Sequence, residues 1–159
     1  MNYTTTVDSP VGTLLLVSDG AALTALHFGG VRDAGRPAGT SIANDAAAPF
    51  PQARQELAEY FAGRRAEFTV PLAPGGTPFQ ARVWEALRRI PHGATASYAE
   101  IARAVGSPGG ARAVGTACRR NPLAIIVPCH RVIGSDRTLT GYAGGLARKK
   151  RLLELEAGS

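Results

Sequence analysis

The stretch IIVPCHRVIG, residues 125–134, constrains this 159-residue chain more than any other. It has the composition of an apolar strand into which a proline, a cysteine, a histidine and an arginine are inserted. Pro128 cannot donate a hydrogen bond to a sheet, so we expect it to break the strand or to lie at a sheet edge. Burying the polar groups of His130 and Arg131 without partners costs free energy. We therefore expect both side chains to face something polar, such as a pocket or a ligand.

Cys129 has two interpretations. A cysteine in an apolar strand is most often a core residue. A neighbouring histidine and positive charge, however, lower the pKa of a thiol and favour the nucleophilic thiolate. Because adjacent strand residues point to opposite faces, Cys129 and His130 need a bend or an intervening water to act together. A third group must orient the imidazole. The acidic residues downstream are Asp136, Glu154 and Glu156.

The cysteine and histidine pattern argues against a metal centre. The chain has two cysteines, Cys118 and Cys129, no CxxC pair and three widely separated histidines. We expect free thiols and no metal, with Cys118 as a small core residue. No run approaches the roughly 18 apolar residues of a membrane span, and the N-terminus has no secretory signal pattern. We expect a cytoplasmic protein that does not contact membranes.

The charge is unevenly distributed along the chain. Residues 1–77 hold 5 basic and 7 acidic residues, a net −2, whereas residues 78–159 hold 13 basic and 5 acidic residues, a net +8. Nucleic-acid binding takes most of its non-specific affinity from such positive charge. A basic surface that only aids solubility is the alternative.

The segment APGGT, residues 73–77, coincides with this change of charge, and we place a domain boundary there, giving domains 1–76 and 77–159. Residues 1–28 predict a three-stranded antiparallel meander. The Gly- and Pro-rich residues 29–50 predict a long loop, and residues 51–63 an amphipathic helix that starts near Pro51 and stops at Gly63.

The C-terminal half predicts helices around one apolar strand. Thr77 with Gln80, and Ser97 with Glu100, have the spacing of capping boxes. Two short helices joined by SPGG within residues 97–120 predict a helix-turn-helix. The second of these helices is basic and otherwise rich in small residues, as a groove-binding helix should be. Its basic residues are Arg112, Arg119 and Arg120, and its small residues are Ala111, Ala113, Gly115, Thr116 and Ala117. The alternative is an ordinary helical hairpin in a core.

Four segments carry a resemblance to a known family: SYAEIARAVG, ARAVG, NPLAIIVPCHRVIG and TGYAGGLARKKRLLELE. They resemble the O6-alkylguanine-DNA alkyltransferases, also called methylated-DNA–protein-cysteine methyltransferases. Specific motifs cover residues 77–159, and DSPVGTL and YFAG extend the resemblance loosely over the N-terminal part. It implies an α/β (α+β) fold. A small ribonuclease-H-like antiparallel sheet with a helix would precede a winged-helix-like helical domain that contains the helix-turn-helix.

The resemblance also implies an activity. The alkyl group of O6-alkylguanine, and of O4-alkylthymine, in duplex DNA would pass irreversibly to one cysteine in a single turnover, with the target base flipped out. Cys129 would be the acceptor, and His130 the base, acting through a water. Glu156 would hold the histidine, Asn121 would brace the turn around the cysteine, and Tyr98 would face the guanine N3. No cofactor or metal takes part, and we expect a monomer without an obligate protein partner.

The DNA-binding and pocket residues follow from the same resemblance. Arg112 matches the arginine that fills the gap left by the extruded base. The other residues expected at the DNA are Ala111, Arg119, Ser97, Thr116 and Gly115. The residues expected to line the base pocket are Val132, Tyr142, Ala143 and Gly144. Ala143 departs from relatives that have a serine there, which puts the tolerance for bulky alkyl groups in doubt.

Three other functions compete with repair. A helix-turn-helix regulator could use its cysteine as a sensor, but it usually needs an effector or dimer module, for which this chain has little room. A non-repairing relative that binds alkylated DNA would lack the acceptor cysteine. A Cys-His hydrolase would turn over repeatedly and would need no basic helix pair.

Overall fold

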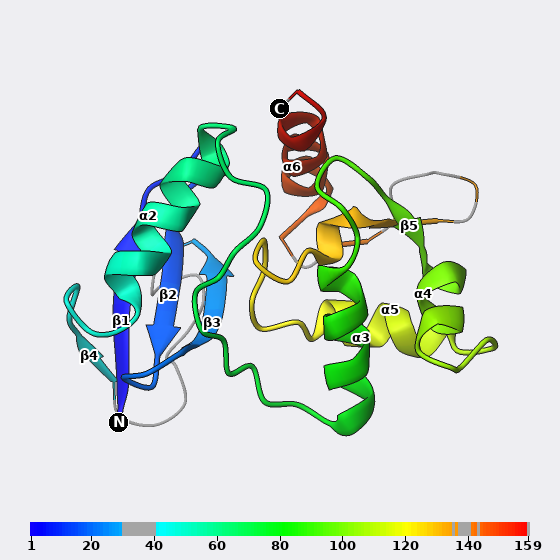
Figure 1. Ribbon diagram of the computed structural model, residues 1–159, viewed down its shortest axis with the longest axis horizontal. Coiled ribbons are helices and arrows are strands. Elements are labelled where there is room, and N and C mark those ends of the chain that lie inside the picture. The colour runs from blue at the N-terminus through cyan, green and yellow to red at the C-terminus, as the bar shows by residue number, and fades with distance from the viewer. Residues whose placement is uncertain (30–40, 135, 137–140, 143, 159) are drawn as a thin grey trace. The chain divides into compact units, whose positions relative to one another are not determined.

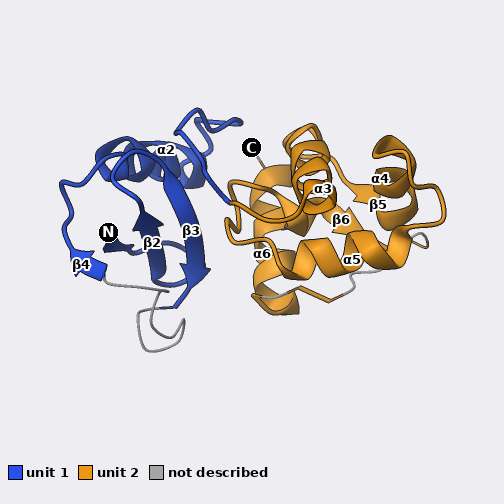
Figure 2. Cartoon of the chain, turned by 90° about the horizontal axis from the view of Figure 1, so that it is seen from below, with its two compact units in different colours: residues 1–74 blue, residues 75–159 orange. Residues whose placement is uncertain are grey.

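The computed structural model describes residues 1–29, 41–134, 136, 141–142 and 144–158. These residues form two compact units, Met1–Pro74 and Gly75–Ser159, which Figure 2 shows in separate colours. The division lies within the segment 73–77, where two consecutive glycines, Gly75 and Gly76, adopt positive φ angles of 68° and 88°. Each unit has its own core.

The first unit is a four-stranded sheet in the order β3-β2-β1-β4. The strands are β1 (Asn2–Val7), β2 (Leu14–Ser18), β3 (Leu23–Phe28) and β4 (Ser41–Ala43). β1, β2 and β3 pair antiparallel, so the predicted meander is confirmed. The interpretation of residues 29–50 as a loop is wrong at residues 41–43, because β4 pairs parallel with β1 in register Tyr3↔Ile42. Three exposed residues give no periodic signal, and their partner strand lies far away in sequence.

Helix α2 (Phe50–Phe61) crosses one face of this sheet (Figure 1). It has Pro51 in its first turn, and the chain leaves the helix at Gly63 with a φ of 74°, as predicted. Its apolar face, which includes Leu57 and Tyr60, is buried, and both residues are at most 1% exposed. The buried Glu56 accepts hydrogen bonds from the Thr69 and Val70 backbone N–H groups and so ties the helix to the strand-like segment that follows it.

The second unit is mainly helical. Its helices are α3 (Pro78–Arg88), α4 (Tyr98–Ala104), α5 (Ala111–Arg119) and α6 (Leu146–Ala157). Both predicted capping boxes are present, with Thr77 at the start of α3 and Ser97 at the start of α4. The α4–turn–α5 pair forms where the helix-turn-helix was expected. The indole Nε1 of Trp84 on α3 donates to the Ala117 carbonyl on α5 at 3.0 Å, which fixes α5 against the core.

The predicted apolar strand is wrong. The run that precedes Cys129 consists of turns, and residues Cys129–Arg131 form a short 3-10 helix, η1. Only Val132–Ile133 is a strand, β6, and it pairs parallel with the two-residue strand β5 (Ala96–Ser97). Ile125 explains the difference, because its positive φ of 72° is incompatible with an extended chain.

Candidate active site

Cys129 is the first residue of η1 and is 6% exposed. The side chain of Asn121 organises the turns before it. Asn121 Oδ1 accepts a hydrogen bond from the Leu123 N–H at 2.9 Å, and its Nδ2 donates to the Val127 carbonyl at 2.8 Å. The same Nδ2 donates to Sγ of Cys129 at 3.3 Å. One amide therefore holds both the backbone of the turn and the sulfur.

His130 and Arg131 converge on one carboxylate of α6, Glu156. Nε2 of His130 lies 2.7 Å from Oε2 of Glu156. Arg131 donates through Nε to Oε1 at 2.9 Å, through Nη2 to Oε2 at 3.0 Å, and through Nη1 to the Ile90 carbonyl at 2.7 Å. All three side chains are buried. The side chains of His130 and Arg131 therefore face polar groups, as expected, and the polar partners of Arg131 belong to the protein itself.

Glu156 is the downstream acid that reaches the imidazole, while Glu154 is exposed and lies 4.0 Å from Lys150. On the other side of the imidazole, Nδ1 of His130 is buried and has no hydrogen-bond partner among the described residues. This nitrogen can therefore bind a proton or form a hydrogen bond with a bridging water. Since η1 is a tight helical turn, Cys129 and His130 do not point to opposite faces as they would on a strand.

Opposing effects act on the pKa of the Cys129 thiol. Burial raises the pKa of the Cys129 thiol, and this effect outweighs the Asn121 hydrogen bond and the charge of Lys149, which both favour the thiolate. Burial likewise lowers the pKa of His130, against the opposing effect of Glu156. Burial therefore favours the neutral form of both groups.

Two features of the buried cluster were not predicted from the sequence. One is the Arg131–Glu156 ion pair. The other is Lys149, which is fully buried and whose charge acts on the thiols of both Cys129 and Cys118. Burial lowers the pKa of this ammonium group, whereas the two thiols raise it. Helical spacing could have identified Lys149 as a buried residue, because Lys149 and Glu156 are seven residues apart and share the buried face of α6 with Leu152.

The β5–β6 pairing connects this cluster to Tyr98. β6 follows directly after Arg131, and β5 ends at Ser97, immediately before Tyr98, with Ser97 opposite Ile133 in register. Ser97 Oγ accepts the Glu100 N–H at 3.1 Å and so caps α4. A short parallel pairing thus brings the first residue of α4 next to the chain that follows η1.

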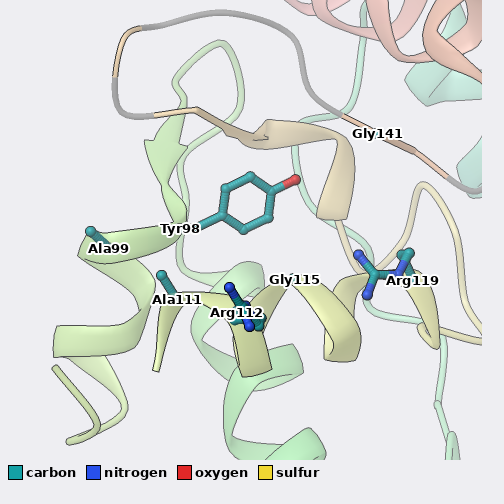
Figure 3. Close-up of a pocket in the computed structure, with 7 residues that line it drawn as sticks. All are labelled: Tyr98, Ala99, Ala111, Arg112, Gly115, Arg119 and Gly141. Carbon is teal, nitrogen blue, oxygen red and sulfur yellow. The ribbon is translucent and has the colours of Figure 1, made fainter. Parts of the chain in front are cut away.

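A cavity of about 460 Å³ opens between α4 and α5. Its lining residues are Tyr98, Ala99, Ala111, Arg112, Gly115, Arg119 and Gly141. Figure 3 shows the ring of Tyr98 extending over α5, with Arg112 and Arg119 on either side of Gly115. A Cβ at Gly115 would lie 3.8 Å from Cε1 of Tyr98, which is ordinary van der Waals contact, so the ring lies against this part of α5.

Helix α5 presents two exposed arginines beside this cavity. Thr116 lies between them: its hydroxyl donates to the Arg112 carbonyl at 3.2 Å and accepts a hydrogen bond from Nη2 of Arg119 at 3.2 Å. Arg119 is thereby oriented along the helix. The exposed face of α5 combines small residues with fixed positive charge, which suits a nucleic-acid groove.

The predicted residues therefore form two groups. Cys129, His130, Asn121 and Glu156 form the buried cluster, and the residues of α4 and α5 line the cavity. The predicted pocket residue Val132 is buried in β6, opposite Ala96. Tyr142 and Gly144 are partly buried, and the Tyr142 side chain favours the Cys129 thiolate. Ala143 lies outside the described residues.

The described part of the chain contains no group of three or more His, Cys, Asp and Glu side chains that could hold a metal ion. Among the same residues, no helix is both long and apolar enough to cross a membrane.

Comparison with known proteins gives a consistent family. Residues 78–158 match the family described as 6-O-methylguanine DNA methyltransferase, DNA binding domain, and residues 2–74 match its ribonuclease-like domain. A methylated-DNA–protein-cysteine methyltransferase of Mycobacterium bovis is 52% identical over 95% of this chain and 90% of its own length. The constitutive enzyme of that name from Bacillus subtilis is 46% identical over 96% and 93%, respectively.

A solved structure agrees with these sequence relatives. The Mycobacterium tuberculosis protein OGT, crystallised in complex with DNA, superposes with a TM-score of 0.88 and 48% identity, covering 98% of this chain and 93% of that one. The matches cover both units and nearly all of the described residues. The chain belongs to the 6-O-methylguanine DNA methyltransferase family.

Proposed function

We propose that the protein repairs DNA by moving the alkyl group of O6-alkylguanine, and of O4-alkylthymine, from duplex DNA to Cys129. The observation that carries the proposal is the buried Cys129–Asn121 contact at 3.3 Å, next to the 2.7 Å contact of His130 with Glu156. In this proposal Cys129 is the nucleophile, His130 is the base and Glu156 is the group that orients the base. The names of the relatives support the same chemistry.

The thiol must lose its proton for this reaction. A water passes the proton of Cys129 to Nδ1 of His130, and Glu156 stabilises the resulting imidazolium. The Asn121 amide and the charge of Lys149 stabilise the thiolate. The proton moves within the buried cluster, so the net charge of the cluster does not change and no charge is transferred into a desolvated site.

The transfer itself is a displacement at carbon. A lone pair of Sγ forms the S–C bond while the C–O6 bond breaks, and the electron pair leaves with the guanine. The hydroxyl of Tyr98 donates to N3 of the departing base and stabilises its charge. Because the product is a stable thioether, each molecule reacts once. A soft thiolate performs this displacement without a metal or an organic cofactor.

The alkylated O6 atom lies inside the base stack, so the nucleotide must be flipped out of the duplex. Helix α5 would enter the minor groove, where Ala111, Gly115 and Thr116 permit close approach and Arg119 meets the phosphates. Arg112 would fill the gap left by the base. The flipped base would then lie near Tyr98, with Val132, Tyr142, Ala143 and Gly144 forming the remaining wall.

The proposal is tested by the loss of O6-methylguanine from an oligonucleotide duplex, measured by chromatography of its nucleosides. One equivalent of protein should remove one equivalent of the lesion and then stop. Cys129→Ser should remove none, whereas Cys118→Ser, a matched change at the other buried thiol, should still repair the duplex. Repeated turnover by the wild-type protein, or full repair by Cys129→Ser, would refute the assignment.

A further inference from the structure

The side chain of Arg131 holds three elements together at the acceptor site. It extends from η1 to the Glu156 carboxylate on α6, with contacts of 2.9 and 3.0 Å, and to the Ile90 carbonyl after α3 at 2.7 Å. Its side chain is only 7% exposed. A buried fork with both carboxylate oxygens as acceptors is a strong, charge-assisted contact. Arg131 does not reach the sulfur or the cavity through any of these bonds, so an effect on the reaction must pass through Glu156.

The ion pair with Arg131 bears on whether Glu156 faces His130 as a carboxylate or as a neutral carboxyl group. Glu156 is 2% exposed, and a carboxyl group so deeply buried prefers to be neutral unless a cation pairs with it. Arg131 supplies that cation at both oxygens, so Glu156 remains a carboxylate. An ionised carboxylate can only accept hydrogen bonds. The 2.7 Å contact with His130 therefore requires the proton to be on Nε2.

The tautomer decides whether His130 can act as a base. With the proton on Nε2, the lone pair is on Nδ1, the nitrogen that has no hydrogen-bond partner among the described residues. If Glu156 were neutral, its O–H could donate to Nε2, and the imidazole proton would move to Nδ1. The histidine would then present a donor where the thiol proton must go.

We propose that Arg131 is a positioning residue that keeps Glu156 ionised and thereby holds His130 in the Nε2–H tautomer, with Nδ1 ready to accept the thiol proton. The inference rests on the proposed function for its kinetic consequence, but the tautomer can be measured without any reaction. The charged and titratable groups around the imidazole are Glu156 and Lys149 from α6 and Arg131 and Cys129 from its own turn.

The first test is spectroscopic. Protein labelled with ¹⁵N-histidine reports the protonation of each ring nitrogen, and a His130→Gln sample assigns the signals among the three histidines. In the neutral form, wild-type His130 should carry its proton on Nε2. Arg131→Met, which keeps the length of the chain but removes the charge, should shift His130 toward the Nδ1–H tautomer. Arg131→Lys should retain the wild-type tautomer, because a cation still faces Glu156.

The second test is kinetic. Arg131→Met should slow methyl transfer to Cys129 by ~10-fold or more. It should also move the rising limb of the rate–pH profile to higher pH, because the thiol must then ionise without the relay. Arg131→Lys should recover most of the rate. Arg151→Met, at an exposed arginine of α6, is the matched control and should behave as wild type in both tests.

An unchanged tautomer and rate profile in folded Arg131→Met would overturn the inference. If that variant does not fold, the spectra of the wild-type protein and of Arg131→Lys decide the question. An Nδ1–H tautomer of His130, either in the wild type or in folded Arg131→Lys, would contradict the proposed role of the positive charge at position 131. If the wild-type protein transfers no methyl group, the proposed function fails, while the tautomer still reports separately on Arg131.

Discussion

At the residue scale, burial and reactivity make opposite demands on Cys129. Burial raises the pKa of the thiol and so protects it from adventitious oxidation and alkylation, since the thiolate is the reactive form. The Asn121 amide and the charge of Lys149 act in the opposite direction and favour the thiolate. Under the proposed mechanism, the thiol becomes reactive when its proton moves to His130, so its reactivity would depend on the geometry of that proton transfer.

The two buried thiols predict a loss of stability at alkaline pH. Burial raises the pKa of Cys118 to about 12 and also raises that of Cys129, whereas an unfolded thiol titrates near 9.0. Above that pH the unfolded chain binds fewer protons than the folded chain, so the free energy of unfolding falls as pH rises. The expected slope is about 1.4 kcal/mol per pH unit for each thiol.

Urea unfolding between about pH 8 and 10.5 measures this slope. Cys118→Ala should have a shallower slope than the wild type, because one of the two thiols is removed. Parallel curves for the two proteins would show that the Cys118 thiol titrates in the folded state as it does in the unfolded chain.

At the element scale, helices α3 and α4 begin with equivalent capping boxes, but we expect only the cap of α4 to affect methyl transfer. Ser97 starts α4 directly before Tyr98, and Thr77 starts α3 with the same reciprocal hydrogen bonds but is not among the residues that line the cavity between α4 and α5. Ser97→Ala and Thr77→Ala should each lower the free energy of unfolding by about 1 kcal/mol. Only Ser97→Ala should also slow methyl transfer, because Tyr98 then loses its fixed position. Equal transfer rates in the two variants would show that the Ser97 cap serves stability alone.

We expect Arg112 on helix α5 to affect the repair of duplex DNA but not the transfer reaction itself. Arg112→Ala should slow repair of O6-methylguanine in duplex DNA by ~10-fold or more, because the flipped state loses the side chain that fills the stack. Its reaction with free O6-benzylguanine should change little. The two rates are compared by mass spectrometry of Cys129, with Arg151→Ala as the control. Equal losses on both substrates would place Arg112 in folding or in the pocket.

Four helices of this chain could be predicted from its sequence, and the short strands could not. Capping pairs, turn residues and periodicity locate α2, α3, α4 and α5, because those signals are local. β4, β5 and β6 depend on partners distant in sequence, and the turns before Cys129 depend on the side chain of Asn121 and the positive φ of Ile125.

For the site, local chemistry singled out Cys129 and His130, but periodicity left Glu156 as one of three acids, and the family resemblance was needed to choose it. The sequence left open whether Cys129 is buried, because burial is a property of the folded unit.

At the scale of the whole molecule, residues 78–159 carry the excess positive charge, 13 basic against 5 acidic residues. Binding of an undamaged duplex should therefore weaken by ~10-fold or more between about 50 and 200 mM salt. Fluorescence anisotropy of a labelled duplex measures this. The reaction of Cys129 with free O6-benzylguanine should depend little on salt over the same range. A salt-independent affinity would mean that phosphate contacts do not dominate binding.

The most direct test of the whole account is the mass of the protein after reaction with a duplex that contains O6-methylguanine. One methyl group, a gain of about 14 Da, should appear per molecule even with excess substrate, and fragmentation should locate it on the sulfur of Cys129. An unmodified mass after the lesion has disappeared, more than one methyl group per molecule, or a methyl group on Cys118 would contradict the account.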